Sequence, residues 1–269
     1  MSRNSLKSVM RLIDAANEQI PIETQFLQDL QNSIEKANNE SYKPSQTIKP
    51  SSFNCIRNAY FQVIGEEPEN TKSTYQLIGI CDSGTDRHIR IQKAIEKMHD
   101  VLGIDCEYID IEAFINQRNL TDLEVKSKSG METKVYNKKY NMSFMTDGII
   151  RYKGKYYILE FKTETADKFY NRTYVDESHY NQATCYSLNF GLDDVLFIYE
   201  NRNTLDLKSY IFNVSEEMRI NLIDKITVVL VSAESKRIPP KPIDVLKKTC
   251  SYCAYRNKCE QIGQGAKYE

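Results

Sequence analysis

The sequence predicts an α/β or α+β protein built around a β-sheet. Three features predict this class. They are an amphipathic helical segment at residues 83–102, an apolar hairpin at residues 145–163, and an alternation of helix and strand over residues 177–232. With 269 residues the chain can bury a substantial core, in one large domain or two small ones.

The first 47 residues are polar and are predicted to form a helical extension. Two segments separated by Pro21 carry apolar residues at helical spacing: Leu12, Ile13, Ala16 and Ile20, then Phe26, Leu27, Leu30 and Ile34. Residues 38–52 are rich in turn formers, so we expect a loop or linker there. Residues 48–269 are then expected to form the main domain.

The remaining elements follow in order. The helix at residues 83–102 is expected to begin with Asp82 or Ser83 as its cap and to bury Ile91, Ile95, Met98 and Leu102. Residues 105–142 are expected to be irregular, with short strands near 123–126 and 133–137. After the hairpin we expect a helix at 177–189, strands at 195–200 and 207–213, and a long helix at 215–232.

Charge and hydropathy exclude several classes of protein. The net charge is −1 and the sequence pI is near 6.4, so a nucleic-acid site must be a local patch. Nothing near the N-terminus resembles a signal peptide, and the longest apolar run, residues 226–233, is far below the roughly 20 residues that span a bilayer. We expect a cytoplasmic protein without a membrane partner, whose seven cysteines stay reduced.

The hairpin carries charged residues where a sheet should pack. If Lys153 and Gly154 form a two-residue turn, Asp147 in the first strand lies opposite Glu160 in the second, and Lys162 shares their face. Opposed carboxylates repel unless a cation lies between them, and oxygen ligands suit Mg²⁺ or Mn²⁺. The hairpin therefore indicates a divalent metal site, with an exposed polar face as the alternative. The E-x-K pattern alone carries little, since it recurs at residues 124–126, 132–134 and 234–236.

Two other segments supply further polar groups. His88 continues the apolar stripe of its helix, three residues before Ile91. Gln182 and Tyr186 are i, i+4 neighbours on one helical face. Taken singly, each is equally well explained as a satisfied core residue.

Taken together, these residues resemble the PD-(D/E)xK nuclease superfamily, specifically its RecB-like branch. The motifs follow in the right order: Gly84-x3-His88, Asp147-x12-Glu160-x-Lys162 and Gln182-x3-Tyr186. One departure is Thr146, where the family often has proline. The resemblance implies a restriction-endonuclease-like core, an αβββαβ-type mixed sheet flanked by helices.

The resemblance also implies roles for these residues. The metal ligands for Mg²⁺ or Mn²⁺ would be His88, Asp147, Glu160 and the main-chain carbonyl of Phe161, and the catalytic set would be Asp147, Glu160, Lys162, Gln182 and Tyr186. In the family the lysine helps to position or deprotonate the attacking water. Phosphodiester hydrolysis needs an activated water and neutralisation of negative charge, and a metal with a lysine supplies both.

Three cysteines stand close together near the C-terminus, as Cys250-x2-Cys253-x5-Cys259. This spacing is a strong sign of metal ligands, and Cys55 is the expected fourth. The other cysteines lie in apolar settings and are expected to be core thiols: Cys81, Cys106 and Cys185. Spacing alone does not separate a Cys₄ zinc site from an iron–sulfur cluster.

The cysteine pattern is similar to that of the CRISPR-associated RecB-like exonuclease family, and AddB-type helicase–nucleases share it. This resemblance covers about residues 48–263 and includes Arg57, two residues after the first cysteine. It implies a helical lobe formed by both chain ends around a [4Fe–4S] cluster bound by Cys55, Cys250, Cys253 and Cys259. Closing a loop of about 200 residues restricts the unfolded chain, so we expect a structural role for the cluster.

Basic residues interleaved with tyrosines near the hairpin suit single-stranded DNA: the candidates are Arg151, Lys153, Lys155 and Tyr186. A solvated rim with packed tyrosines explains them equally well. We expect a metal-dependent DNA exonuclease acting on single-stranded or frayed ends in a bacterial or phage-infected cell. It would work alone, as a homo-oligomer, or with helicase or CRISPR adaptation proteins. The alternative is a non-catalytic iron–sulfur module that binds DNA or protein.

Overall fold

The computed structural model describes residues 21–40, 45–69, 73–129, 132–242, 245 and 247–262. These residues belong to two compact units. The smaller unit comprises α2 (Ile22–Glu40) and residues 73–79, which include the start of α4 (Tyr75–Glu96). The larger unit comprises the other described residues. The first predicted apolar stripe, residues 12–20, lies outside the described part of the chain.

In the smaller unit, α2 begins directly after Pro21, as predicted, because proline is tolerated at a helix start. Its predicted apolar stripe is not buried, since Phe26 and Leu27 are 64% and 55% exposed. The Glu35 carboxylate accepts a hydrogen bond from the main-chain N–H of Tyr75 at 2.7 Å. This contact links α2 to the first turn of α4.

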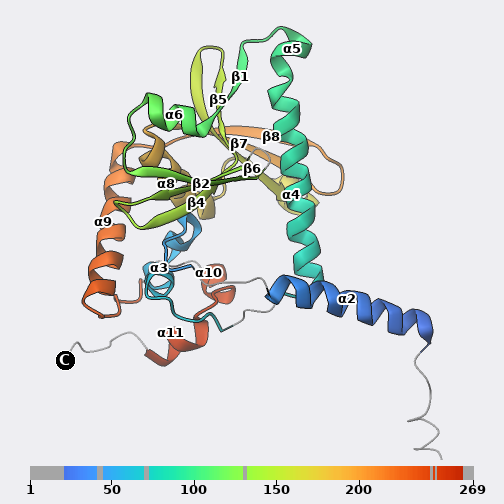
Figure 1. Ribbon diagram of the computed structural model, residues 1–269, viewed down its shortest axis with the longest axis vertical. Coiled ribbons are helices and arrows are strands. Elements are labelled where there is room, and N and C mark those ends of the chain that lie inside the picture. Colours follow the sequence, from blue (N-terminus) through green and yellow to red (C-terminus); the bar gives the residue numbers. More distant parts are fainter. Residues whose placement is uncertain are drawn as a thin grey trace, which may run out of the picture. The chain divides into compact units, whose positions relative to one another are not determined.

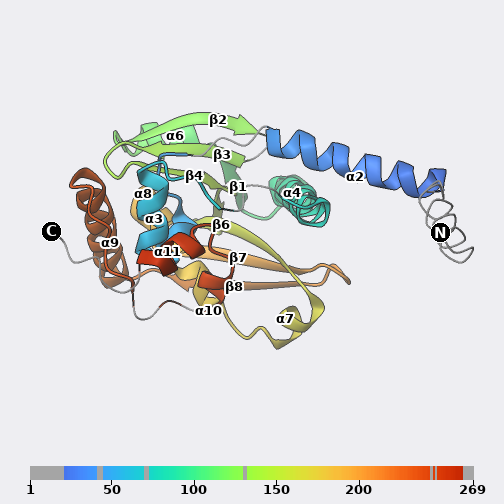
Figure 2. The same ribbon diagram turned by 90° about the horizontal axis from the view of Figure 1, so that it is seen from below.

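The larger unit is a mixed α/β fold with two sheets in separate layers (Figures 1 and 2). Five strands form the order β1-β5-β6-β7-β8, in which β6 and β7 are parallel and the other neighbours antiparallel. Their bounds are β1 Cys106–Ile109, β5 Ile149–Tyr152, β6 Lys155–Glu164, β7 Asp194–Asn201 and β8 Leu207–Asn213. The second, antiparallel sheet contains β2 (Leu123–Ser129), β3 (Glu132–Asn137) and β4 (Met142–Thr146). The mixed sheet flanked by helices agrees with the predicted α/β class.

The larger unit also contains α-helices and short 3₁₀ helices. They are η1 (Pro50–Asn54), α3 (Ile56–Val63), α5 (Met98–Leu102), α6 (Ile111–Gln117), α7 (Ala166–Asn171), η2 (Glu177–His179), α8 (Tyr180–Phe190), α9 (Glu216–Glu234), α10 (Lys247–Ser251) and α11 (Arg256–Ile262). Helix α8 connects β6 to β7, because parallel neighbours need a crossover. Among the residues described, no helix has the length and apolar character to cross a membrane.

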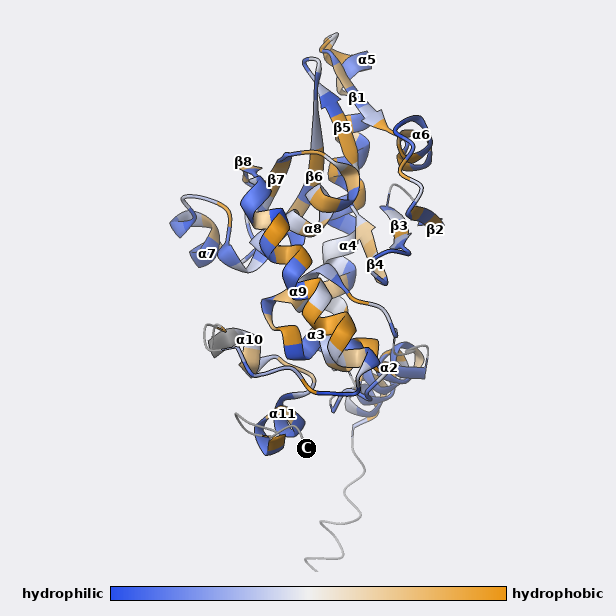
Figure 3. Cartoon of the chain, turned by 90° about the vertical axis from the view of Figure 1, so that its left-hand side faces the viewer, coloured by the Kyte–Doolittle hydropathy of each residue, from blue (hydrophilic) through white to orange (hydrophobic). Residues whose placement is uncertain are grey.

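Each face of β6 contacts its own apolar cluster. Ile158 belongs to a cluster that includes Tyr186 of α8, whereas Leu159 and Phe161 belong to a cluster that includes Ile91 of α4. This separation follows from the alternation of side chains along a strand. Figure 3 shows hydrophobic residues along β5 and α9. The sheet is therefore buried on both faces at its central strand, β6.

The helix predicted at residues 83–102 begins eight residues earlier, at Tyr75, so the predicted cap at Ser83 is wrong and lies inside α4. A glycine costs a helix only about 1 kcal/mol, so Gly79 does not stop it. Helix α4 ends at Glu96 and α5 follows. Ile91 is buried as predicted, whereas Leu102 is 63% exposed.

Residues 105–142 are more regular than predicted, because they contain β1, α6, β2 and β3. The Asp110 carboxylate caps α6 by accepting the N–H of Ala113 at 2.8 Å. The strands expected near 123–126 and 133–137 are present as β2 and β3. They pair with each other, and β3 also pairs with β4, so β3 is the central strand of the second sheet.

The first strand of the predicted hairpin is interrupted: β4 ends at Thr146 and β5 begins at Ile149, where the sequence predicted one continuous strand. Gly148 has φ +136°, a conformation that L side chains rarely adopt, and an added Cβ would meet the Tyr108 hydroxyl at 2.0 Å. The hydroxyl of Thr146 accepts the N–H of Gly148 at 3.2 Å. Asp147 is therefore not inside a strand but at the junction where the chain leaves one sheet and enters the other.

Candidate metal and catalytic site

The predicted turn and register of the hairpin are confirmed. Lys153 and Gly154 have φ +49° and +79°, as a two-residue type I′ turn requires, and Ile149 pairs with Ile158. Beyond this pair the main-chain N–H of Leu159 donates to the carbonyl of Gly148 at 2.9 Å. The regular ladder stops there, one residue before Asp147.

Past this point the side chain of Asp147, and not a main-chain group, accepts the next hydrogen bond from β6. Its Oδ2 accepts the main-chain N–H of Phe161 at 2.7 Å, and its Oδ1 lies 3.0 Å from Nδ1 of His88. Its carbonyl accepts the amide of Gln92 at 2.7 Å and the hydroxyl of Tyr108. Both the main chain and the carboxylate of Asp147 are thus fixed at the sheet edge.

Four other predicted residues form one hydrogen-bonded chain. Nζ of Lys162 lies 2.5 Å from the Glu160 carboxylate and donates to Oε1 of Gln182 at 3.1 Å. The Gln182 amide nitrogen donates to the Tyr186 hydroxyl at 2.7 Å, and that hydroxyl donates to the carbonyl of Met145 at 2.9 Å. Burial raises the pKa of Tyr186, which keeps its hydroxyl a donor. The network fixes the position of the Lys162 ammonium group.

These groups lie on opposite faces of β6. His88 comes from α4, and its ring lies 4.8 Å, edge to face, from the ring of Phe161. Glu160 and Lys162 alternate with Phe161 and so face the other side, toward α8. Asp147 lies at the edge between the two faces. The site therefore lies on both sides of β6, at the point where its pairing with β5 has ended.

A residue that sequence reasoning missed, Glu132, completes a group of three ligand atoms. One atom each from His88, Glu132 and Asp147 lie within 4.8 Å of one another, and Nδ1 of His88 is 3.8 Å from the Glu132 carboxylate. Glu132 begins β3, and the pairing of Thr133 with Thr146 brings it opposite Asp147. The signal that could have found it is a hairpin turn at residues 138–141, a region that the sequence analysis expected to be irregular.

The acids of the site are held in a repulsive setting. Burial raises the pKa of Glu160 to about 7; the Asp147 carboxylate adds to the rise, while Lys162 opposes it. Burial also raises the pKa of Glu132. Burial lowers the pKa of His88, but its hydrogen bond with Asp147 and the nearby carboxylates outweigh this, so the net pKa is raised. A cation placed among these groups would relieve the repulsion.

The pKa of Glu160 predicts a pH-dependent stability of the metal-free protein. The folded-state pKa lies above the ordinary value of 4.5, so the folded protein binds the extra proton. That stabilisation is complete below pH 4.5 and is lost as the pH rises to about 7, amounting to at most about 3 kcal/mol. In Glu160→Gln this group cannot ionise. The free energy of unfolding of the variant should therefore increase relative to that of the wild type as the pH rises from 4.5 to above 7.

Thermal unfolding in a chelator, from pH 4.5 to 8, measures this difference between variant and wild type. An exposed acid, changed by Glu234→Gln, serves as the control. Parallel melting profiles for wild type and Glu160→Gln across this range would show that the Glu160 carboxylate is not destabilised by its surroundings.

Three predicted DNA contacts lie away from the site. Arg151, Lys153 and Lys155 lie at the tip of the β5–β6 hairpin, at least five residues from Glu160 along β6. Arg151 and Lys155 already form ion pairs with carboxylates on or next to β1 and at the start of β7. Tyr186 reaches the site but is buried. The structure therefore does not gather these candidates into one surface at the site.

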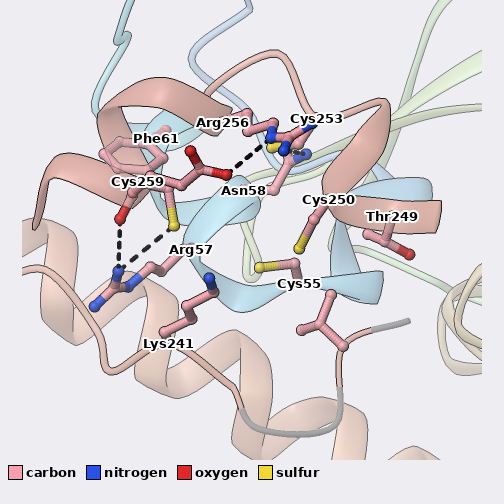
Figure 4. Close-up of a pocket in the computed structure, with 12 residues that line it drawn as sticks. Cys55, Arg57, Asn58, Phe61, Lys241, Thr249, Cys250, Cys253, Arg256 and Cys259 are labelled. Atoms are coloured by element: carbon pink, nitrogen blue, oxygen red, sulfur yellow. Dashed lines mark hydrogen bonds and ion pairs between the residues drawn. The ribbon is translucent and has the colours of Figure 1, made fainter. Parts of the chain in front are cut away.

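The four cysteines predicted to act together line one pocket: Cys55, Cys250, Cys253 and Cys259 (Figure 4). Cys55 precedes α3, and the other three lie in or between α10 and α11. Burial raises the pKa of Cys55 and Cys253, and the neighbouring thiols raise it further. Within the described chain, no three of these sulfurs lie within 4.8 Å of one another.

Hydrogen-bond donors surround the cysteine pocket. The buried Arg57 guanidinium donates to the carbonyl of Pro239 at 2.8 Å, and one of its nitrogens lies 3.5 Å from the sulfur of Cys259. The Asn58 amide nitrogen lies 3.8 Å from the sulfur of Cys253. Donors in such positions would hydrogen-bond the sulfurs of a bound metal centre and orient them.

The remaining cysteines divide differently from the prediction. Cys106 and Cys185 are buried, as expected, but Cys81 is exposed. The prediction took apolar neighbours as a sign of burial, yet Ile80 beside it is itself 49% exposed. Cys81 is therefore not a core thiol.

Comparisons with known proteins return a structural neighbour at low identity. No model of a known protein family matches the chain, and no curated protein matches it. Among solved structures, the chain is similar to one described as "Crystal structure of SSO0001", with 15% identity over 90% of this chain and 98% of that chain, and a TM-score of 0.45. A likeness of this size carries no functional inference.

Proposed function

We propose that the protein is a divalent-metal-dependent DNA nuclease with a RecB-like PD-(D/E)xK core, acting as an exonuclease on single-stranded or frayed ends. One observation carries the proposal. Ligand atoms of His88, Glu132 and Asp147 converge at the strand that carries the buried Glu160 and its half-buried partner Lys162. Such a cluster does not stabilise the core, because removing charged groups from water costs free energy unless an opposite charge compensates for it.

The converging residues fit a hard divalent cation. Two carboxylates and an imidazole suit Mn²⁺ as well as Mg²⁺, because oxygen ligands bind both and imidazole favours the transition metal. His88, Glu132 and Asp147 would hold it. When bound, the metal would polarise the phosphodiester and lower the pKa of a water.

Two predicted ligands lie next to this group. The N–H and C=O of a strand residue point to the same edge, and the N–H of Phe161 already points to Asp147. The carbonyl of Phe161 is therefore directed to the same edge. The Glu160 carboxylate would have to turn from Lys162 to join the metal. Its raised pKa shows that the ionised carboxylate is unfavourable where it lies, and a bound cation would stabilise it.

Lys162 would stabilise negative charge on the phosphate. Burial lowers the pKa of Lys162, but the Glu160 carboxylate raises it by more, so the ammonium stays protonated. The Gln182 amide, oriented by its donation to Tyr186, accepts one of its protons and sets its direction. A cation fixed in this way needs no reorganisation when charge develops in the transition state.

Digestion of DNA labelled at either end tests this function. Single- and double-stranded substrates are incubated with Mn²⁺ or Mg²⁺ and with wild type, Glu160→Ala, Lys162→Ala, or the exposed-lysine control Lys97→Ala. We expect Lys162→Ala to lower the rate by about 10²- to 10³-fold. Equal rates in all four proteins would contradict the proposed site, and no cleavage by wild type would favour the non-catalytic iron–sulfur module.

The cysteine pocket would hold a [4Fe–4S] cluster, with zinc as the alternative. Four cysteines from distant parts of the chain line this one pocket, and Arg57 and Asn58 place nitrogen donors next to two of the sulfurs, which supports a centre bound by thiolates. Bound there, the cluster would join the segment before α3 to α10 and α11.

A further inference from the structure

A groove leads to the proposed site across the second sheet. Residues of the segment 45–51 and of the strands β3 and β4 line it, together with Gln182 and Tyr186 of α8. Lys49, Lys134 and Met145 contribute to its walls. The groove is distinct from the cysteine pocket and from the hairpin tip.

The groove is cationic in a chain that is nearly neutral overall. The described residues that line it include Lys49 and Lys134 but no carboxylate, although the sequence holds 37 acidic and 36 basic residues. Both lysines are exposed, and neither forms an ion pair with any residue that the structure describes. Arg151 and Lys155 at the hairpin tip differ, because carboxylates already pair with them. The charge in the groove is therefore available to an anionic ligand.

Main-chain hydrogen bonds hold one wall of the groove in place. The N–H of Ile48 donates to the carbonyl of Asn141 at 2.8 Å, and the N–H of Ser143 donates to the carbonyl of Ile48 at 2.9 Å. The Asn141 amide also donates to the carbonyl of Gln46 at 3.0 Å. The segment that carries Lys49 is thus attached along β4, and the groove exists without a ligand.

The groove meets the site at two points. Lys134 follows Glu132 by two residues in β3, so both side chains lie on one face of the sheet, and Lys134 pairs with Met145 across it. Gln182, which also lines the groove, accepts the hydrogen bond from Lys162. A chain lying in the groove would therefore reach both the metal ligands and the ammonium group.

We infer that this groove binds the backbone of a single strand of nucleic acid and leads it to the site, an inference that rests on the proposed function. Lys49 and Lys134 bind phosphates, and the hydroxyls of Ser45 and Ser143 are further donors. Met145, 47% exposed, offers an apolar surface to a base.

Binding of a fluorescent single-stranded oligonucleotide in EDTA tests the inference, with anisotropy measured over a series of salt concentrations. The Lys49→Ala/Lys134→Ala variant should bind roughly tenfold more weakly at 0.1 M salt. Its log affinity should depend on log salt with a slope smaller by about 1.4, for two lost phosphate contacts at about 0.7 each. The control Lys139→Ala/Lys236→Ala removes the same charge from exposed positions elsewhere. Lys49→Arg/Lys134→Arg should restore binding.

A small chromogenic phosphodiester separates this inference from the proposed function. Such a substrate occupies only the site, so its metal-dependent hydrolysis should be equal in wild type and in Lys49→Ala/Lys134→Ala. If both double-alanine variants bind the oligonucleotide equally, or wild type does not bind it, the groove inference is overturned while hydrolysis of the small diester still supports the nuclease. If wild type hydrolyses neither substrate, the proposed function fails, and the inference fails with it.

Discussion

Asp147→Asn is expected to abolish Mn²⁺ binding and to lower the rate of DNA cleavage by more than about 10³-fold. Asp147 is the residue where the group containing His88 and Glu132 meets the edge of β6. An asparagine oxygen can still accept the N–H of Phe161, so the junction should keep its shape. The substitution removes the negative charge that binds the cation and that raises the pKa of His88.

Calorimetric titration with Mn²⁺, alongside the cleavage rate, measures this effect. Glu132→Gln should give a smaller loss of Mn²⁺ affinity, about 10- to 100-fold, because Glu132 is less buried and the other ligands remain. Asp100→Asn changes an exposed acid and should leave affinity unchanged. An unaltered Mn²⁺ affinity in Asp147→Asn would show that the convergence of these three residues is not a metal site.

Cys259→Ser is expected to give a colourless protein that has lost its iron and melts at a lower temperature. Cys55 and Cys250 are separated by about 200 residues, and a link across a loop of this length restricts the unfolded chain by roughly 5 kcal/mol. The variant should still fold. Tyr255 packs on Phe61 with ring centroids 5.2 Å apart, and this contact does not involve sulfur.

Iron content, visible absorbance and thermal unfolding of protein purified without air measure this prediction. Cys81→Ser is the matched control, because that thiol is exposed and outside the pocket. It should stay brown and melt like wild type. Stoichiometric zinc in a colourless wild-type protein would replace the iron–sulfur assignment with a Cys₄ zinc site.

Local sequence signals predicted the parts of the site that are carried by neighbouring residues. The Lys153-Gly154 turn set the register of the hairpin, and that register was right. The i, i+4 spacing of Gln182 and Tyr186 predicted a shared helical face, and their side chains are hydrogen bonded. The close spacing of the C-terminal cysteines placed them in one pocket with Cys55. Turn chemistry and periodicity are properties of adjacent residues, so a single sequence can reveal them.

Tertiary structure decided where these parts meet. Asp147 was expected inside a strand, but the positive φ of Gly148 and its contact with Tyr108 end β4 there and place Asp147 between two sheets. Glu132 reaches the site through the hairpin of β3 with β4, and it becomes a ligand candidate only because this hairpin ends beside Asp147 and His88.

Tertiary structure also decided which basic side chains form ion pairs. Arg151 is neutralised by residues more than 40 positions away, whereas Lys134 on β3 is left unpaired in the described structure. The sequence by itself predicted most of the helices and strands, the hairpin register and the candidate ligands other than Glu132. Which strands pair, and which charges remain open to a substrate, depended on long-range contacts, because those follow from the burial of whole faces and not from the order of neighbouring residues.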